Sequence, residues 1–216
     1  MKLKVMSFNV GIWSRNRKKS DKFYWKDRMQ AMYRMIFDQD PDVICFQELW
    51  FPATRYIPKN YRKVFGTGLE HPIYVREGIK TGIGLFSIYW SMARIEGIRV
   101  FSIHGHWDDR RIERLCNSTR KIYAKDLTPA VLAGDWNAEY VGLYQGTQLL
   151  TSARVQCGVE RDDTYIHFRE SWRRGELDHI LLYRLIPAEY KIVREWYGAF
   201  GGRISDHYPV IVTIKK

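Results

Sequence analysis

Cysteine is scarce in this chain, and its three cysteines, Cys45, Cys116 and Cys157, show no paired spacing. An odd number of cysteines without a CxxC motif argues against a disulfide framework and against a zinc site. Cys45 lies inside an apolar run, where a small hydrophobic residue belongs to the core. The chain is therefore expected to take its stability from packing.

Long hydrophobic runs are also missing. No segment approaches the roughly 18 apolar residues that a membrane-spanning helix needs. The N-terminal residues lead directly into a strand pattern, without the apolar stretch of a signal peptide. We therefore expect no transmembrane segment and a reducing, cytoplasmic setting.

Internal repeats, low-complexity tracts and linkers are absent as well. The chain has 216 residues, 45% of them hydrophobic and 15% aromatic, which suits a folded domain with a sizeable core and argues against disorder. We expect one domain over residues 1–216, and a monomer.

Acidic residues are outnumbered, at 24 against 35 Lys and Arg, which gives a formal net charge of +11. Much of the excess lies in residues 1–35, where ten basic residues face only Asp21 and Asp27. Such a bias favours a polyanionic partner, either nucleic acid or an anionic membrane surface. The simpler alternative is a solvated basic surface.

The spacing of apolar residues predicts a strand at 3–8, a helix at 24–38 and a buried strand at 43–46. This strand–helix–strand opening indicates a layered α/β protein, in which two sheets pack together. Residues 51–80 read as loop with one short strand near 73–75. Further along, we expect strands at 83–90, 98–104, 127–133, 177–183, 191–196 and 208–214, and a helix at 108–126.

Six of these hydrophobic runs begin or end at a short polar cluster. A strand end fixes a side chain better than a free loop does, so the clusters can converge on one site that binds a hard metal ion and handles phosphate. The polar residues in question are Asn9, Glu48, His104, Asp135, Asn137, Asp178, Asp206 and His207.

Carboxylates and amides suggest the chemistry. Glu48, directly after an apolar strand, suits Mg²⁺, which takes one or two carboxylates and keeps several waters. Asp135 and Asn137 are two residues apart and can face the same way. Asp135 can orient or deprotonate water, and the Asn137 amide can stabilise charge on phosphoryl oxygens. The alternatives are that Glu48 is an ordinary strand-end charge and that Asp135 and Asn137 form an Asx turn.

Histidines complete the predicted site. Asp206 and His207 are neighbours in an extended segment and therefore face opposite ways, one toward the metal and the other toward the phosphate. Asp178 is a candidate to fix the His207 tautomer. Either His104 or His106, on the same strand face, can protonate a leaving oxygen. The remaining histidines, His71, His167 and His179, are expected to be structural.

Six motifs occur in a fixed order along nearly the whole chain: MSFNVG (6–11), PDVICFQEL (41–49), FSIHGHW (101–107), LAGDWNAE (132–139), GELDHILL (175–182) and SDHYPV (205–210). Together they resemble the endonuclease/exonuclease/phosphatase superfamily, which includes apurinic endonucleases, deoxyribonucleases and sphingomyelinases. The resemblance implies a four-layer α/β/β/α sandwich with two packed mixed sheets. It also implies metal-dependent cleavage of phosphoesters, with magnesium as the metal and manganese as a substitute.

The resemblance also implies a role for each matched residue. Asn9, Glu48 and Asp206 correspond to metal-side residues, and Asp135 to the group that activates water. Asn137 corresponds to a phosphate-binding amide. His207 corresponds to the catalytic histidine, Asp178 to its orienting carboxylate, and His104 to a further site histidine with His106 as the fallback. Two departures, Asp178-His179 for the commoner Asp-Tyr and His104-Gly105 for His-Leu, leave the carboxylate intact but weaken the His104 assignment.

Three hypotheses concern the substrate. The first is a nuclease or DNA-end-processing enzyme, with DNA favoured over RNA, whose substrate-binding cations follow two of the strand ends. Those cations are Arg15, Arg17, Lys18, Lys19, Arg110 and Arg111. The second is a phosphatase or phosphodiesterase for a small phosphorylated or lipid head-group substrate. The third, a non-catalytic phosphate-binding module, conflicts with the completeness of the predicted site.

Overall fold

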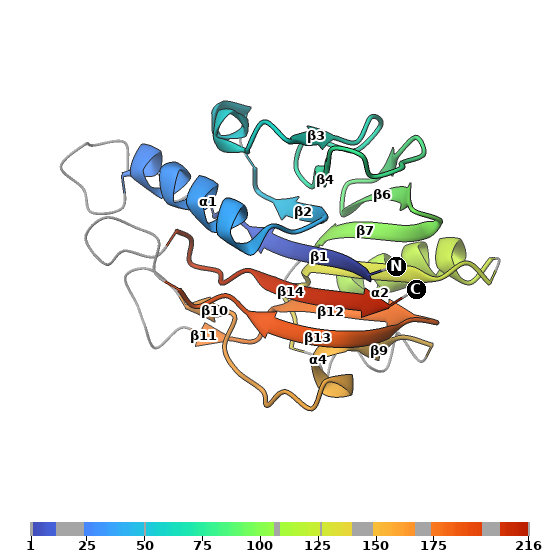
Figure 1. Ribbon diagram of the computed structural model, residues 1–216. Coiled ribbons are helices and arrows are strands. Elements are labelled where there is room, and N and C mark those ends of the chain that lie inside the picture. The colour runs from blue at the N-terminus through green and yellow to red at the C-terminus, as the bar shows by residue number, and fades with distance from the viewer. Residues whose placement is uncertain are drawn as a thin grey trace.

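Two six-stranded mixed sheets form the centre of the molecule (Figure 1). The computed structural model describes residues 2–11, 24–49, 51–105, 109–125, 127–139, 149–166, 174–195 and 204–215. The first sheet has the order β13 (Ile186–Ile192), β14 (Val210–Lys215), β1 (Lys2–Asn9), β2 (Val43–Gln47), β4 (Ile73–Arg76), β3 (Tyr61–Lys63). The second has the order β5 (Leu85–Phe86), β6 (Trp90–Ile95), β7 (Ile98–His104), β8 (Ala130–Asp135), β12 (Asp178–Tyr183), β9 (Thr151–Ser152).

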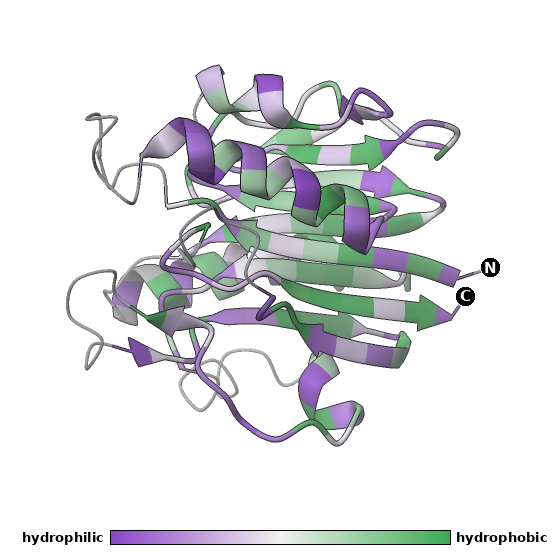
Figure 2. Cartoon of the chain, turned by 60° about the vertical axis from the view of Figure 1, so that its left-hand side comes forward, coloured by the Kyte–Doolittle hydropathy of each residue, from purple (hydrophilic) through white to green (hydrophobic). Residues whose placement is uncertain are grey.

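Helices cover the outer faces of both sheets. The two covering helices are α1 (Trp25–Gln39) and α2 (Asp109–Tyr123). The remaining elements are small: the 3-10 helix η1 (Phe51–Tyr56), the one-turn helix α4 (Ala153–Gln156), and the strand pair β10 (Tyr165–Ile166) and β11 (Arg174–Gly175). Figure 2 shows that the strands are mostly hydrophobic, whereas α1 alternates hydrophobic and hydrophilic residues along its length. That alternation is typical of a helix with one buried face.

Three apolar cores hold the layers together. Strand side chains alternate between faces, so Val5 and Val212 of the first sheet meet Val131 and Ile180 of the second between the sheets. Met6 and Phe8 point the other way, against Met29 and Met32 of α1. On the far side, Leu115 of α2 packs against Phe101 and Leu132. The layer order is therefore helix, sheet, sheet, helix, as predicted.

Strand register brings the predicted site residues to one edge of the sandwich. β1 and β2 are parallel, and Asn9 pairs with Gln47 at the end of the register. β7 and β8 are also parallel, and their register ends on the pair His104–Asp135. β12 runs antiparallel to β8, which places its first residue, Asp178, opposite Asp135.

The sequence pattern misplaces some elements. Within the strand predicted at 83–90, the structure has only the two-residue β5 and Trp90, the first residue of β6, which extends to Ile95. The apolar side chains that suggested a strand there, Ile83, Phe86 and Ile88, are exposed. The strand predicted at 191–196 lies at Ile186–Ile192, and the predicted loop at 51–80 contains η1 and β3. Within the described residues, no helix is long and apolar enough to cross a membrane.

Candidate active site

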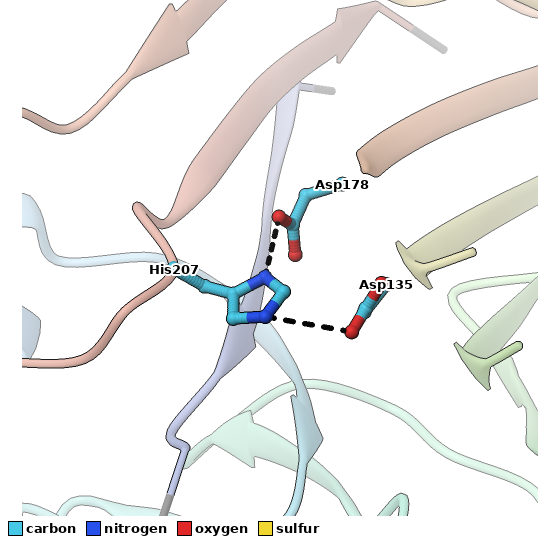
Figure 3. Close-up of side chains that lie close together, drawn as sticks. All are labelled: Asp135, Asp178 and His207. Atoms are coloured by element: carbon cyan, nitrogen blue, oxygen red, sulfur yellow. Dashed lines mark hydrogen bonds and ion pairs between the residues drawn. The ribbon is translucent and has the colours of Figure 1, made fainter. Parts of the chain in front are cut away.

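A histidine between two carboxylates lies at the centre of the site (Figure 3). His207 Nδ1 donates to Asp178 Oδ2 at 2.8 Å, and His207 Nε2 lies 3.7 Å from Asp135 Oδ2. All three side chains are buried, and the Tyr165 ring packs against the imidazole with ring centroids 4.9 Å apart. Because Nδ1 is engaged by Asp178, Nε2 is the nitrogen that faces the site.

The electrostatics of this trio favour a charged imidazole. Burial by itself would lower the pKa of His207, but Asp178 and then Asp135 raise it above its ordinary value. Burial raises the pKa of Asp178, while the neighbouring His207 lowers it. The pair is therefore an imidazolium and a carboxylate at neutral pH, and Nε2 carries a proton that it can donate.

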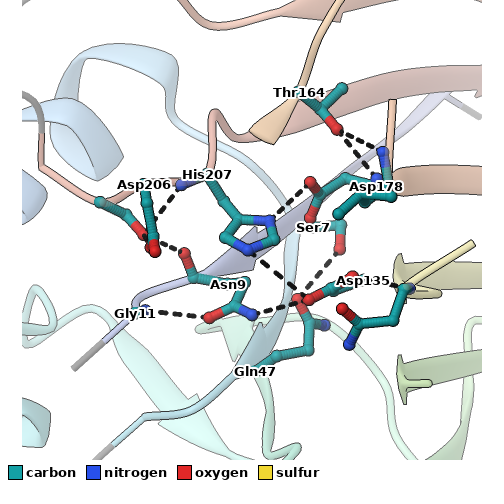
Figure 4. Close-up of polar contacts among 12 residues, drawn as sticks. Ser7, Asn9, Gly11, Gln47, Asp135, Thr164, Asp178, Asp206 and His207 are labelled. Carbon is teal, nitrogen blue, oxygen red and sulfur yellow. Dashed lines mark hydrogen bonds and ion pairs between the residues drawn. The ribbon is translucent and has the colours of Figure 1, made fainter. Parts of the chain in front are cut away.

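Asn9 connects this trio to Glu48. Figure 4 shows its side chain between Asp135 and Gly11. Asn9 Nδ2 donates to Asp135 Oδ2 at 2.9 Å and to Glu48 Oε1 at 3.3 Å. Its amide oxygen accepts from the Gly11 backbone at 2.9 Å, which fixes the orientation of the amide. Gly11 has a φ of +57°, and a Cβ there would collide with Asp206 Oδ1. The left-handed conformation favours glycine at this position, and the close approach of Asp206 leaves no room for a Cβ unless that side chain shifts.

Backbone strain coincides with two predicted site residues. Glu48 and Asn137 have φ values of 55° and 51°, in the left-handed region that most residues avoid. The Asn137 backbone N–H donates to Asp135 Oδ1 at 2.8 Å, and its side chain donates to the Gly105 carbonyl at 3.2 Å. Asn137 is thus held beside Asp135, with one amide hydrogen left for a ligand.

His104 lies across the site from His207. His104 Nε2 is 3.6 Å from Glu48 Oε1 and 3.8 Å from Asp135 Oδ2, and its side chain is 24% exposed. A partly exposed imidazole next to two carboxylates can exchange a proton with a ligand or with solvent. The alternative candidate, His106, lies outside the described residues.

Asp206 turns away from its neighbour His207. Ser205 Oγ contacts both the Asn9 carbonyl, at 2.8 Å, and Asp206 Oδ1, at 3.2 Å. Asp206 therefore lies on the β1 side, next to Gly11, while His207 faces Asp178. The Glu48 carboxylate contacts the Asn9 side chain directly, and the Asp206 carboxylate is joined to the Asn9 backbone through Ser205.

Two groups of residues offer ligand atoms for a metal. Asp135, Asp178 and His207 have ligand atoms within 4.8 Å of one another, and within this group His207 Nδ1 is hydrogen-bonded to Asp178. The second group is the set that the sequence predicts, Asn9, Glu48 and Asp206, of which Asn9 and Glu48 are in direct contact. Burial raises the Glu48 pKa, and among the described residues the Glu48 carboxylate pairs only with Asn9 and His104. A mostly buried carboxylate without a Lys or Arg partner among the described residues fits a hard divalent cation.

Only some of the predicted substrate-binding cations belong to the described residues. Arg15, Arg17, Lys18 and Lys19 lie outside the described residues. Arg110 is exposed in the first turn of α2, which begins shortly after the His104 strand end, and Arg111 follows it in the helix. Of the predicted cations, Arg110 and Arg111 therefore belong to described elements, at the start of α2.

Buried polar contacts that the sequence did not single out support the site from beneath. Gln47 Nε2 donates to Ser102 Oγ at 3.2 Å, and Ser102 Oγ donates to the Phe46 carbonyl at 2.9 Å. Ser7 Oγ also contacts Gln47, at 3.4 Å, so this chain of contacts joins the two sheets just behind the site. Its signal in the sequence was a polar residue within each of three apolar strands.

His179 supports the loop that follows β8. His179 Nε2 donates to the Ala138 carbonyl at 2.9 Å, and Nδ1 lies 3.8 Å from Glu176, which is itself paired with Arg154 at 2.6 Å. The contact holds the residue after Asn137. His179 is thus structural, as the sequence suggested, and its bond to Ala138 adds a positioning contact.

Stability is expected to depend on pH through His179. Burial lowers the pKa of His179 from 6.5 to about 4, although the Ala138 carbonyl opposes the shift. Between these values the unfolded chain binds a proton that the folded chain does not, so stability falls as the pH drops from 6.5 toward 4. Urea unfolding of wild type and of His179→Gln should show a loss between pH 7 and pH 5 that is about 2 kcal/mol larger in wild type. Equal losses in the two proteins would contradict the assignment, because other titrating groups are common to both.

Comparison with known proteins agrees with this geometry. The model of the endonuclease/exonuclease/phosphatase family matches residues 7–207. A comparison with curated proteins yields no significant match.

Several solved structures share the fold. A humanized TDP2 from D. rerio has a TM-score of 0.80 at 16% identity, covering 100% of this chain and 99% of that chain. The mannosyl-6-phosphatase of Bacteroides thetaiotaomicron has a TM-score of 0.79 at 16% identity, covering 99% and 100%. D. rerio TDP2 complexed with a single-stranded DNA product has a TM-score of 0.78 at 17% identity, covering 100% and 99%. With the family match over nearly its whole length and the layered fold it requires, this chain belongs to the endonuclease/exonuclease/phosphatase family.

Proposed function

We propose that this chain is a magnesium-dependent phosphodiesterase acting on nucleic acid, a nuclease or DNA-end-processing enzyme that favours DNA over RNA. The observation that carries the hydrolytic part is the continuous arrangement from Asp178 through His207 and Asp135 to Asn9 and Glu48. It contains a proton donor, a proton acceptor and a cluster of metal-ligand oxygens within one site.

Each residue has a step in the proposed hydrolysis. Asp135 accepts a proton from water as the water oxygen forms its bond to phosphorus. His207 Nε2 and the free hydrogen of the Asn137 amide donate to the phosphoryl oxygens, on which negative charge grows. The bond from phosphorus to the leaving oxygen breaks, and His104 supplies the proton for that oxygen.

Asp178 acts through His207. It holds the imidazole by its Nδ1 and balances the positive charge of the ring. Because Asp178 is fully buried, this interaction is not weakened by solvent.

The metal-binding residues in this proposal are Asn9, Glu48 and Asp206. When bound, Mg²⁺ supplies Lewis-acid stabilisation of the charge on the phosphoryl and leaving oxygens, and Mn²⁺ can substitute for it. Asn9 also orients the Asp135 carboxylate through its amide. The same residue therefore links metal binding to the position of the base.

Charge supports a nucleic-acid substrate. The formal net charge of +11 favours a polyanion, and Arg110, in the helix that follows the His104 strand, is exposed. A structure with the same fold, that of D. rerio TDP2, was solved with a single-stranded DNA product. The scarcity of cysteine further supports our proposal of a cytoplasmic location.

A second candidate is a phosphatase for a small phosphorylated substrate. It is favoured by the mannosyl-6-phosphatase, whose TM-score of 0.79 and identity of 16% are practically those of TDP2. In that case, the positive charge would serve a phosphorylated head group.

A matched substrate panel tests the proposal. It contains single- and double-stranded DNA, an abasic duplex, a 5′-tyrosyl oligonucleotide, RNA, an inositol polyphosphate, mannose 6-phosphate and sphingomyelin, each with Mg²⁺, Mn²⁺ or EDTA. We expect cleavage of DNA substrates with either metal and none with EDTA, and a lower rate on RNA. The rate on DNA should also fall steeply with added salt, since cations bound to DNA are released on binding.

Two outcomes would contradict this expectation. Turnover confined to mannose 6-phosphate, inositol polyphosphate or sphingomyelin would favour the second candidate function, an enzyme for small phosphorylated or lipid head-group substrates. Full activity in EDTA would remove the metal from the proposal.

A further inference from the structure

An apolar pocket of about 540 Å³ opens next to Glu48. Its lining includes Phe51 of η1, Tyr74 of β4, Leu69 in the segment that leads to β4, and Glu48. Binding pockets for small organic groups have volumes of roughly 300–1,000 Å³ and mainly apolar walls. This pocket has both properties.

The pocket and the candidate active site share a wall. The Glu48 backbone N–H donates to the Glu70 carbonyl at 3.1 Å, which fixes residues 69–72 beside the end of β2. Glu70 and Pro72 line the pocket. His71, between them, packs its ring against His104 with centroids 6.2 Å apart. A ligand whose phosphate is held near Glu48 and His104 can therefore extend into the pocket.

The exposed side chains at the pocket indicate its ligand. Phe51 is 74% exposed and Leu69 is 79% exposed, although both are large and apolar. Large apolar side chains that line a cavity and remain exposed to solvent can bury their surface against another apolar group. Phe51 provides an aromatic face, and stacking on such a face is favourable for any planar ring.

Polar groups narrow the choice further. Thr54, Lys63 and Glu70 also line the pocket and offer hydrogen-bond donors and acceptors. A sugar or inositol ring would leave the apolar walls without a partner. A long acyl chain has no flat face to stack on Phe51. A planar aromatic ring stacks on that face, and a nucleobase also offers polar edges to the polar groups of the wall.

We infer that this pocket binds a planar aromatic group, either a nucleobase or an aryl ester, carried by a phosphoester whose phosphate lies in the site containing Glu48, His104 and Asp135. The inference rests on the proposed function, and it names the part of the substrate that the hydrolytic residues do not contact. It makes Phe51 and Leu69 determinants of substrate preference.

Two pairs of non-hydrolysable ligands test this assignment by equilibrium binding in Mg²⁺. The first pair is phenylphosphonate and methylphosphonate, and the second is the 5′-phosphonate analogues of thymidine 5′-phosphate and 2-deoxyribose 5-phosphate. We expect the aromatic member of at least one pair to bind about tenfold more tightly, because stacking on an aromatic side chain is worth that much or more. A preference in the phenyl pair alone identifies an aryl ester, and one in the thymidine pair identifies a nucleobase.

Phe51→Ala should remove most of the aromatic preference. Phe65→Ala is the matched control, since Phe65 is 81% exposed and does not line the pocket, and it should keep the preference. Both residues are exposed, so neither change is expected to unfold the chain. Leu69→Ala should reduce the preference in the same direction as Phe51→Ala.

Other results would overturn the inference. If both members of each pair bind equally, or if Phe51→Ala and Phe65→Ala behave alike, the pocket is not an aromatic subsite. Loss of binding to anionic lipid vesicles in both variants, with unchanged phosphonate binding, would instead make these residues a membrane contact. If the substrate panel shows hydrolysis while the aromatic preference is absent, only the subsite fails. If no substrate is hydrolysed but Phe51→Ala still removes an aromatic preference, only the proposed function fails.

Discussion

Replacing Asp135 by Asn is expected to lower kcat by about 10²–10⁴-fold, the range that a positioned general base contributes. The carboxylate of Asp135 is buried and accepts hydrogen bonds from the Asn9 side chain and the Asn137 backbone. An amide at this position has nearly the same shape and keeps one acceptor oxygen, but it cannot take a proton from water. The loss should therefore appear in the chemical step.

Three measurements on Asp135→Asn separate chemistry from folding and binding. They are kcat on the preferred substrate of the panel, Kd for that substrate, and the thermal unfolding midpoint. Substrate binding should persist, because Asn137, His207 and the proposed metal-side residues are unchanged. Asp38→Asn is the matched control, since Asp38 is exposed on α1, and it should leave kcat within about twofold. An unchanged kcat in Asp135→Asn would reject the assigned mechanism.

Much of the fold followed from the sequence wherever apolar residues are also buried. Met29, Met32 and Ile36 recur at helical spacing and all face the first sheet, so the predicted helix at 24–38 differs from α1 by a single residue at each end. The predicted strand at 83–90 failed for the opposite reason. Ile83 and Phe86 are apolar but exposed, and periodicity cannot distinguish a buried strand from an apolar surface.

The sequence also indicated that the predicted site residues lie at strand ends, because each follows or precedes an apolar run. Their mutual placement depends on strand register, which is set by pairings such as His104 with Asp135 and Asp178 with Asp135. The contacts that support these residues could not be predicted from the sequence. His179 holds the Ala138 carbonyl, 41 residues away in the chain, and His71 packs on His104, and neither contact leaves a local pattern in the sequence.

Asp178 and His207 are expected to behave as one unit. Asp178→Asn should reduce kcat by about 10²–10⁴-fold, because a neutral amide neither fixes the His207 tautomer nor balances the charge of its ring. Asp178 Oδ2 is 2.8 Å from His207 Nδ1, and Asp178 is the largest of the influences that raise the pKa of His207. His207→Gln removes the donor itself and should cost at least as much.

A double-mutant cycle measures the coupling between the two residues. If Asp178 acts through His207, the double variant should have nearly the same kcat as His207→Gln alone, so the individual losses are far from additive. Independent roles would instead give a loss close to the product of the two single losses. Unfolding midpoints of all four proteins must accompany the rates, because both side chains are buried and either change can destabilise the fold. If the double variant remains folded and its loss of kcat is close to the product of the two single losses, the orienting role is excluded. Asp178 would then have a separate function in the site.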